Sequence, residues 1–361
     1  MQKLIQHTKP EIMSELLRRS CTKVSIAWCF LLFFQLANAQ YNFTELDKKL
    51  QQYQRQLGGN VVTMIYKDGK IVYSKSLGDF NPNTQVPIAS CSKWLTAALV
   101  MTFVDEGKLS LDDYVSKYLP IFTDYGKGYI TIRQCLSHLT GIQGDKPLIG
   151  ILKMSKYNSL EEEVNAFASK YEIDVNPGQE FWYGNIGLNT AGRVLEVISK
   201  KPFDRLMQDR IFRPLEMKNS TFASEKAVNP SGGAKSTATD YMNFLTMILN
   251  KGTLNGKKIL SEQSVELMQQ SQTNGIKVKY APDVAQGYNY AFGEWVLETD
   301  ANGKSTCVAS PGLFGTWPFV DIKRNYACIF FVKNLLREER KEIYADLKKT
   351  IDEELKSEVS N

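Results

Sequence analysis

Ser90-Cys91-Ser92-Lys93 places a hydroxyl and an amine three residues apart, at the start of an apolar run that continues to Met101. The run predicts a helix, and residues i and i+3 of a helix share one face, so Ser90 Oγ and Lys93 Nζ are expected within hydrogen-bond reach. A serine becomes a strong nucleophile when a neighbouring base takes its proton, and a lysine whose pKa is lowered by burial can be that base. The stretch therefore indicates a candidate acylating serine. A helix cap followed by a solvated lysine would show the same four residues.

Histidine is too scarce to supply the usual base of a serine hydrolase. The chain has only His7 and His138, so a Ser-His-Asp triad would have to use His138, and no Gly-x-Ser-x-Gly motif accompanies it. A metal site rich in histidine is excluded for the same reason. A serine hydrolase with this sequence would therefore need a lysine as its base.

A secretory leader is predicted at the N-terminus. Basic residues and the apolar run 24–34 are followed by Ala37-Asn38-Ala39, which has the small-x-small pattern of a cleavage site. We expect a signal peptide over residues 1–39, a mature chain of residues 40–361, and an exported protein, either periplasmic or secreted. The apolar run is too short to span a bilayer, so no stable membrane span is expected after cleavage. An uncleaved anchor is the alternative.

The charge of the chain gives no indication of a nucleic-acid partner. The net charge is +5, and the leader carries three of these charges net, so about +2 remains on the mature chain. No basic stripe with interleaved aromatic residues is present, and such a stripe is the electrostatic footprint of nucleic-acid binding. The sequence leaves the oligomeric state open.

The cysteines show no metal-binding pattern. Those beyond the leader are widely spaced, with neither a Cys-x-x-Cys pair nor a zinc spacing; they are Cys91, Cys135, Cys307 and Cys328. Buried free thiols are expected, and a bridge between Cys307 and Cys328 is the alternative in an oxidising compartment.

Strand-like segments lie at both ends of the chain, around a helical middle. The early runs are 61–66 and 70–76, and the segment from about 108 to 235 has mostly helical patterning. The other expected elements are a helix over 43–57, a helix over 240–250, strands over 291–297, 305–310, 317–322 and 326–332, and a closing amphipathic helix over 335–358. This order predicts an α+β domain with one sheet built from both ends, flanked by the N- and C-terminal helices, and a mostly helical inserted subdomain.

Tyr183-Gly184-Asn185 is the second motif with chemical potential. A phenol can carry a proton between a nucleophile and a leaving group if a nearby ammonium lowers its pKa. An asparagine two residues later can orient the lysine or hold a substrate amide. We therefore expect Tyr183 and Asn185 to lie beside Ser90.

Several ordered phrases resemble those of the serine beta-lactamase superfamily, specifically its class C-like group of beta-lactamases, penicillin-binding esterases and D-amino-acid peptidases. They are Ile88-Ala89-Ser90-Cys91-Ser92-Lys93, the segments 105–113 and 136–142, Pro177-Gly178 before Tyr183, and the segments 214–217 and 236–240. The resemblance runs from about residue 45 to 335, and it implies the beta-lactamase/transpeptidase-like fold with an antiparallel sheet.

The resemblance also implies roles for the site residues. Ser90 would be acylated, Lys93 would take its proton, and Tyr183 would relay that proton to the leaving group. Asn185 would support Lys93 and bind substrate, whereas His138 falls in a turn where the family's histidine is structural. Members of the group work without a metal or an organic cofactor, so none is expected here.

The third motif departs from the family pattern. Members usually carry Lys-Thr-Gly or His-x-Gly on a strand that lines the site, and the matching segment here is Ser310-Pro311-Gly312-Leu313. Ser310 would offer a substrate only a neutral hydrogen bond, about half as strong as a charge-assisted one. Gly312 would still permit close backbone approach, and the Leu313 N–H would complete an oxyanion hole with that of Ser90.

Because the usual cation is absent from that motif, we expect an esterase or amidase acting on a small ester, amide or peptide. One alternative is a beta-lactamase or a penicillin-binding D-Ala-D-Ala carboxypeptidase, in which Lys235 or Lys304 would replace the cation. A non-catalytic binding protein on the same fold is a second alternative.

Overall fold

A seven-stranded antiparallel sheet is the largest element of the computed structural model, which describes residues 41–144, 155–335 and 340–356. The predicted leader, residues 1–39, lies outside the described residues. The strand order is β2-β1-β13-β12-β11-β10-β9. The bounds are β1 Val61–Lys67, β2 Lys70–Leu77, β9 Asn289–Tyr290, β10 Trp295–Thr299, β11 Ser305–Ala309, β12 Gly315–Asp321 and β13 Tyr326–Lys333. The early strands β1 and β2 thus join strands from the other end of the chain, which confirms the predicted sheet.

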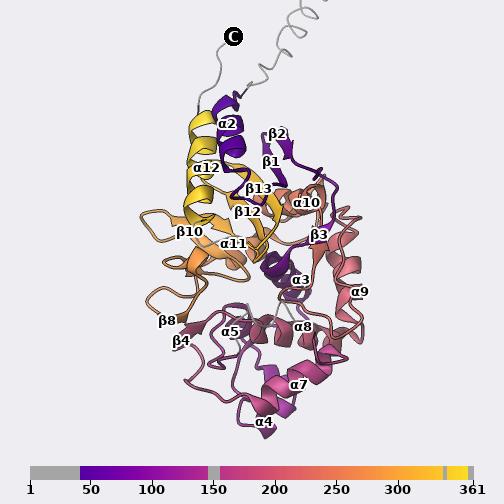
Figure 1. The fold of residues 1–361 in the computed structure, drawn as a ribbon. Helices are drawn as coiled ribbons and strands as arrows, with labels where there is room; N and C mark the ends of the chain where they lie inside the picture. Colours follow the sequence, from indigo (N-terminus) through magenta and orange to yellow (C-terminus); the bar gives the residue numbers. More distant parts are fainter. Residues whose placement is uncertain (1–40, 145–154, 336–339, 357–361) are drawn as a thin grey trace, which may run out of the picture. The chain divides into compact units, whose positions relative to one another are not determined.

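Helices cover both faces of this sheet (Figure 1). On one face, α10 (Ala238–Leu249) packs against β1, β12 and β13. On the other face, α12 (Arg340–Glu354) places Tyr344 against Trp317 and Phe330. Helix α2 (Thr44–Tyr53) lies beside α12 and bonds to it through Asp346. The central strands are buried on both faces, which explains why β13 is a continuous apolar run.

Helices are the main regular elements between β2 and β9, although loops and turns make up more than half of the described residues in the segment 108–235 that was predicted to be mostly helical. Besides α10, the described helices between β2 and β9 are α3 (Ser92–Asp105), α4 (Ile121–Asp124), α5 (Ile132–Leu136), α7 (Leu160–Lys170), α8 (Ile186–Ser199), α9 (Phe203–Met207) and α11 (Glu262–Gln269). Single turns of helix lie at Ala89–Cys91, Val115–Lys117, Gln208–Phe212 and Asp283–Ala285. The short strand pairs are β3 (Val86–Pro87) with β5 (Lys235–Ser236), β4 (Glu180–Trp182) with β8 (Lys277–Tyr280), and β6 (Thr253–Leu254) with β7 (Lys257–Lys258).

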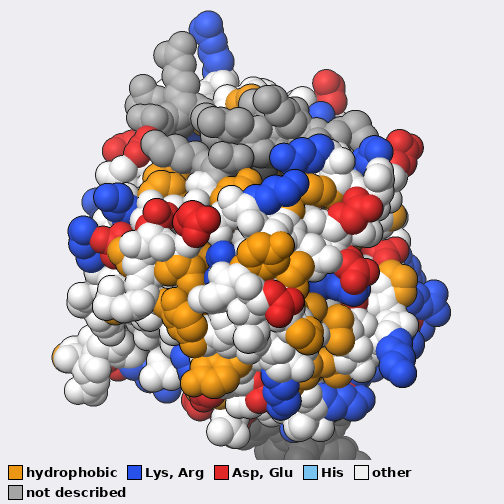
Figure 2. All heavy atoms as spheres, turned by 90° about the horizontal axis from the view of Figure 1, so that it is seen from below, with side chains coloured by type: hydrophobic (Ala, Val, Ile, Leu, Met, Phe, Trp, Pro, Cys, Tyr) orange, Lys and Arg blue, Asp and Glu red, His pale blue; other side chains and the backbone are white. Residues whose placement is uncertain are grey.

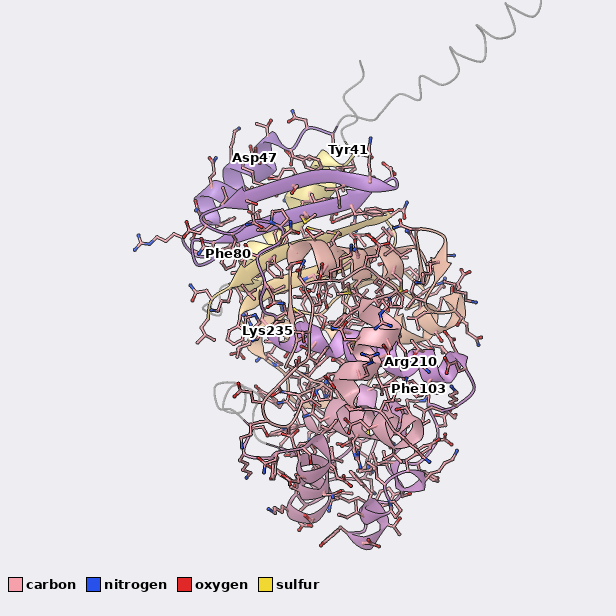
Figure 3. The ribbon with its side chains drawn as sticks, turned by 90° about the vertical axis from the view of Figure 1, so that its right-hand side faces the viewer. Tyr41, Asp47, Phe80, Phe103, Arg210 and Lys235 are labelled. Carbon is pink, nitrogen blue, oxygen red and sulfur yellow. The ribbon has the colours of Figure 1, made fainter. Side chains whose placement is uncertain are left out.

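Helix α3 is buried on all sides. Every residue from Ser92 to Phe103 is buried, including the charged Lys93. Such a helix belongs to the core of a large domain, because an exposed helix would carry a polar face. Near its C-terminal end, the guanidinium of Arg210 lies 4.2 Å from the centroid of the Phe103 ring (Figure 3). The nucleophile motif therefore begins a helix at the centre of the fold.

Several details differ from the sequence-based expectations, and the strand expected over 291–297 is β10, Trp295–Thr299. The helix expected over 43–57 ends at Tyr53, and the following chain turns through Gly58 and Gly59, both with positive φ. The closing helix begins at Arg340 among the described residues, five residues after the expected start. Helix α11, strand β9 and the parallel pair β4–β8 were not predicted. All of them are short, and the pairing of β4 with β8 joins segments that are distant in the sequence.

The alternative of a disulfide is wrong in this structure. Cys91, Cys135, Cys307 and Cys328 are all buried free thiols. Cys307 lies on β11 and Cys328 on β13, with β12 between them. Two strand spacings are about 9.6 Å, which exceeds the Cα separation that a disulfide can span.

The face of the molecule at the α4 end has a mixed surface. Figure 2 shows hydrophobic side chains there, interspersed with basic and acidic ones. Among the helices of the described residues, none combines the length and the hydropathy that a bilayer crossing requires.

Candidate active site

Ser90 lies in a short 3₁₀ turn, Ala89–Cys91, directly before α3. Its neighbour Ala89 has φ +47°, a left-handed conformation that is strained for a residue with a side chain. The turn is held from outside, because Ile88 N–H donates to Ala234 O at 3.0 Å and Tyr241 OH donates to Cys91 O at 2.8 Å. Ser90 is therefore fixed at the start of a helix, where N–H groups have no acceptor within the helix.

Lys93 makes three polar contacts that together orient its amine. Nζ lies 3.2 Å from Ser90 Oγ, 3.4 Å from Asn185 Oδ1 and 2.9 Å from the carbonyl oxygen of Ser231. The amide and carbonyl oxygens can only accept hydrogen bonds, and a neutral amine has two N–H groups and one lone pair. When both N–H groups donate to those oxygens, the lone pair faces Ser90 Oγ. Lys93 is then placed to accept the Ser90 proton.

Burial sets the protonation state of this amine. Lys93 is 0% exposed, and desolvation lowers the pKa of its amine to about 7. A substantial fraction of Lys93 is therefore neutral near neutral pH, which is what a general base requires.

Tyr183 lies directly after β4 and against Lys93. The centroid of its ring is 4.8 Å from Lys93 Nζ, and its phenol interacts with the Ser90 hydroxyl. The backbone of this segment is tied to β8, because Tyr183 N–H donates to Tyr280 O at 3.0 Å. The structure thus brings Ser90, Lys93, Tyr183 and Asn185 together, as the sequence predicted.

His138 braces the Tyr183 segment. Its Nδ1 accepts a hydrogen bond from Gly184 N–H at 3.4 Å, and its Nε2 lies 3.2 Å from Tyr290 OH. Burial, with the charge of Lys93, lowers the pKa of His138 well below its usual value. A neutral imidazole with a hydrogen-bond partner at each ring nitrogen fits a structural role, which agrees with the expectation for His138.

The condition set for Tyr183, a pKa lowered by a nearby ammonium, is not met. Burial raises the pKa of the phenol above its ordinary value, and the contact with Ser90 offsets only part of that rise. The neighbouring amine cannot reverse the effect, because burial also favours the neutral form of Lys93. The raised pKa therefore favours the protonated phenol of Tyr183, which is the form that can donate a proton.

The segment after β11 packs against the nucleophile turn. A Cβ at Gly312 would lie 2.4 Å from Ile88 O and 3.0 Å from Cys91 Sγ, so only glycine allows this approach. Within the described residues, the Leu313 N–H makes no backbone hydrogen bond. That geometry is compatible with the predicted oxyanion hole formed by the N–H groups of Ser90 and Leu313.

The Ser310 hydroxyl, which was expected to bind substrate, contacts the protein backbone in this structure. Its hydroxyl donates to Gly293 O at 2.9 Å, and the side chain is only 3% exposed. The hydroxyl has one proton, so that proton is used within the protein. In this structure the Ser310 hydroxyl therefore supports the loop before β10.

A cation that the sequence analysis missed lies on α12. Arg340 Nη1 donates to Leu313 O at 3.0 Å, with Gly312 O at 3.4 Å. Its charge acts on both Tyr183 and Cys91. No local pattern signals it, because the chain around Arg340 carries as many acidic as basic residues and Arg340 lies 30 positions after Ser310.

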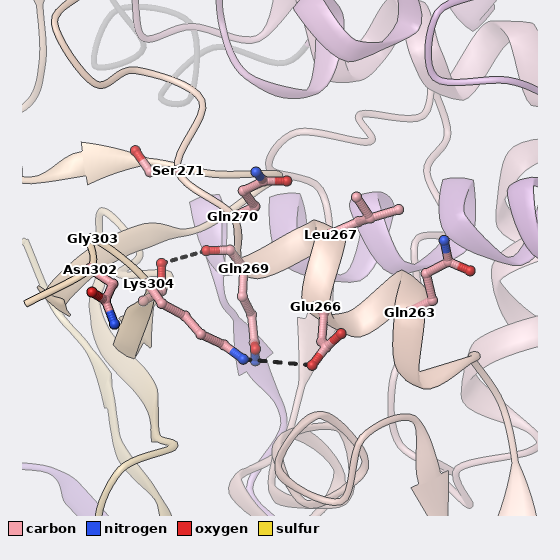
Figure 4. A pocket seen from close by; sticks show the side chains of 10 residues that line it. Gln263, Glu266, Leu267, Gln269, Gln270, Ser271, Asn302, Gly303 and Lys304 are labelled. Atoms are coloured by element: carbon pink, nitrogen blue, oxygen red, sulfur yellow. Dashed lines mark hydrogen bonds and ion pairs between the residues drawn. The ribbon is translucent and has the colours of Figure 1, made fainter. Parts of the chain in front are cut away.

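The two lysines considered as substitute cations do not join the cluster. Lys304 lies in the turn after β10 and pairs with Glu266 at 3.7 Å. That ion pair lies at a pocket beside α11, which shares no residue with the Ser90 cluster (Figure 4). Lys235 is exposed on β5 (Figure 3), and no contact within the described residues joins it to Ser90, Lys93 or Tyr183.

One group of side chains has the ligand types for a metal. Glu298, Cys307 and Asp321 present ligand atoms within 4.8 Å of one another. However, the ammonium of Lys348 contacts Glu298 and Asp321, each at 2.8 Å. A cation of the protein therefore already neutralises these carboxylates.

An antiparallel sheet built from both ends of the chain, with a helical insert and a buried serine–lysine pair between them, is the architecture of beta-lactamase-type serine hydrolases. Residues 46–350 match the model of the Beta-lactamase family. The chain belongs to that family.

Individual relatives agree with this assignment. Protein flp of Staphylococcus aureus strain MW2 is 31% identical over 170 residues, which are 44% of this chain and 34% of that protein. The match thus spans about a third of the length of that relative. A candidate beta-lactamase from Bacteroides dorei DSM 17855 has a solved structure with 29% identity and a TM-score of 0.78, covering 88% of this chain and 100% of that one.

A hydrolase also shares the fold. EstCE1, a hydrolase with promiscuous acyltransferase activity, has a TM-score of 0.69 and 19% identity, covering 85% of this chain and 98% of that one. At this identity the likeness shows the fold alone.

Proposed function

We propose that this protein is an exported serine hydrolase of the class C-like group, which cleaves an ester or amide through an acyl-enzyme on Ser90. The observation that carries the proposal is the Lys93 amine, which is buried, has a pKa of about 7 and lies 3.2 Å from Ser90 Oγ. Burying an amine costs desolvation free energy. An amine held against a serine hydroxyl can activate that serine as a nucleophile, which gives the burial a chemical use.

The proposed acylation uses each neighbour of Ser90. Ser90 Oγ attacks the substrate carbonyl carbon while its proton passes to Lys93 Nζ. The oxyanion accepts hydrogen bonds from the N–H groups of Ser90 and Leu313. The phenol of Tyr183 donates its proton to the leaving group as the bond from that group to the carbonyl carbon breaks, and the proton held by Lys93 then passes to the phenol, so that both groups return to their neutral forms. Water then hydrolyses the acyl ester and releases the acid, which regenerates Ser90.

Covalent labelling tests this proposal. We expect a fluorophosphonate probe to add one adduct to the folded wild-type protein, and peptide mapping to locate it on Ser90. Ser90→Ala should show no adduct, whereas Ser92→Ala, two residues away, should still be labelled. An intact-mass screen against short-chain esters, D-amino-acid amides and beta-lactams would then identify the substrate class. No adduct on folded wild-type protein would favour a non-catalytic binding protein.

Arg340 supports a second candidate, a beta-lactamase or D-Ala-D-Ala carboxypeptidase, because both act on substrates with a carboxylate. The guanidinium beside Gly312 and Leu313 offers a charge-assisted hydrogen bond to such a group. Stable labelling by a fluorescent penicillin would indicate the peptidase, and rapid turnover of a chromogenic cephalosporin would indicate the lactamase.

The substitution Arg340→Gln separates these candidates. If the substrate carboxylate binds Arg340, KM for a carboxylate-bearing amide should rise about 10- to 100-fold, which is the typical weight of a hydrogen bond to a charged group. KM for a neutral ester should change less than twofold. Lys341→Gln removes the adjacent charge and is the matched control. Equal KM changes for both substrates would assign Arg340 a structural role.

Export is part of the proposal and has its own test. The basic residues, the apolar run and Ala37-Asn38-Ala39 support cleavage after residue 39. The full chain should appear outside the cytoplasm with Gln40 as its N-terminal residue by mass spectrometry. A cell-associated protein that retains residues 1–39 would indicate the uncleaved anchor.

A further inference from the structure

A chain of buried polar contacts connects the Lys93 amine to α7 in the helical insert. The first link is the carbonyl of Ser231, which accepts from Lys93 Nζ at 2.9 Å. Ser231 is 0% exposed and lies in a turn outside the helices and strands, which side-chain contacts and the backbone hydrogen bond from Gly233 N–H to Asn229 O both hold. Thr96 on α3 holds the preceding residue, because its hydroxyl donates to Pro230 O at 2.6 Å.

Asn189 on α8 fixes Ser231. Its Oδ1 accepts from Ser231 N–H at 3.0 Å and from Ser231 Oγ at 2.8 Å. The contact with the Ser231 N–H requires the oxygen end of the Asn189 amide to face Ser231, because an NH₂ group cannot accept a hydrogen bond. Asn189 is only 1% exposed, so water does not supply these partners.

Glu163 on α7 sets the direction of the Asn189 amide. Its Oε2 accepts from Asn189 Nδ2 at 2.9 Å. A carboxylate only accepts, and a protonated carboxyl still accepts through its carbonyl oxygen, so this contact favours the NH₂ end toward α7 and the oxygen end toward Ser231. Burial raises the pKa of Glu163 to about 7, and the contact with Asn189 offsets part of that rise. The charged side chain Arg193, also on α8, pairs with Glu161 and Glu196 instead.

We propose that Glu163 is a positioning residue for the Lys93 base, acting through Asn189 and Ser231. If Glu163 cannot accept, the Asn189 amide can turn over. The Ser231 N–H and hydroxyl then keep only Asn229 Oδ1 at 3.1 Å and Asn185 O at 2.9 Å as acceptors, and the Ser231 carbonyl directs the Lys93 amine less firmly. The Lys93 amine then rotates, and its lone pair faces Ser90 Oγ for only part of the time. This inference rests on the proposed acylation of Ser90 with Lys93 as base.

Kinetics of covalent labelling test the inference. The probe is a fluorophosphonate. Two quantities are measured: the maximal rate of adduct formation, and the probe concentration that gives half of that rate. We expect Glu163→Leu to lower the maximal rate about 10-fold, within the range of coupling free energies for residues in one hydrogen-bond network. The half-saturating concentration should stay within twofold, because Glu163 does not touch the probe.

Two further variants separate positioning from a general structural effect. Glu163→Gln keeps an acceptor oxygen and should restore the rate to within about threefold of wild type, and Glu161→Leu, on the same helix, should label at the wild-type rate. Thermal melts show whether each variant is folded. If Glu163→Leu does not fold, Asn189→Leu breaks the next link and is judged by the same criterion.

The outcomes distinguish the two proposals. No labelling of wild type would overturn the proposed function. Labelling of wild type with an unchanged rate in Glu163→Leu, or with Glu163→Gln as slow as Glu163→Leu, would overturn the positioning role alone.

Discussion

Replacing Lys93 with Met should lower the rate of Ser90 acylation about 10³- to 10⁴-fold, the range that a positioned general base contributes. Methionine has a similar length and fits the apolar surroundings of α3, so the protein should fold. Its thioether cannot accept the Ser90 proton at a useful rate, because it is only a weak acceptor. The measurement is the rate of fluorophosphonate labelling, followed by intact mass, with a melt to confirm folding.

Lys93→Arg is the informative companion variant. Arginine keeps a donor for Asn185 Oδ1 and Ser231 O, but its guanidinium stays protonated at all accessible pH values. It should therefore be as inactive as Lys93→Met. Activity of either variant near the wild-type level would show that another group removes the Ser90 proton.

The same amine predicts the pH dependence of the wild-type protein. Because Lys93 must be neutral to act, acylation should rise with pH through about 7, the pKa that burial imposes, and then reach a plateau. Lys93→Met should lack this rise in its residual rate.

Lys93 should also reduce stability near neutral pH. Its folded pKa of about 7 lies below the ordinary value of 10.5, so the unfolded chain binds more protons between these values and stability rises with pH across that window. The cost near pH 7 is about 4 kcal/mol, and hydrogen bonds of about 1 kcal/mol each offset part of it. At pH 7 the free energy of unfolding of Lys93→Met should thus be at least that of the wild type. Near pH 10 the wild type is stabilised, so the variant should compare less favourably with it there. Urea unfolding at both values measures this.

Lys348→Met should lower the free energy of unfolding by about 3 kcal/mol, because it leaves buried carboxylates without a partner. Lys348 Nζ lies 2.8 Å from Glu298, 2.8 Å from Asp321 and 2.9 Å from Asp352, and the Asp321 side chain is 0% exposed. Arg324 remains 2.6 Å from Asp321, so the loss should fall short of the largest values for buried pairs.

Urea unfolding at pH 7 measures this loss, and Lys349→Met is the control. Lys349 is exposed on the same helix, so its replacement should change stability by less than about 0.5 kcal/mol. A Lys348→Met variant as stable as its control would show that Arg324 alone neutralises the cluster.

Local patterns predicted the elements that depend on neighbouring residues. The β1–β2 hairpin follows from Lys67-Asp68-Gly69, and in the structure Asp68 and Gly69 both adopt the positive φ that a tight hairpin turn needs. Helix α3 follows from its apolar run. The parallel pair β4–β8 could not be predicted, because β8 is mostly exposed and its partner lies about a hundred residues earlier.

The sequence alone determined that Ser90 and Lys93, the proposed nucleophile and base, lie together, since they are three residues apart and one helical turn brings them together. Only the tertiary structure decided their chemistry. The pKa of Lys93, the direction of its lone pair and the protonated state of Tyr183 depend on burial by segments distant in the sequence, among them Asn185 and Ser231. The cation on α12 and the contact from Glu163 also come from distant segments. A pattern of neighbouring residues cannot encode them, because burial and long-range contacts exist only once the chain has folded.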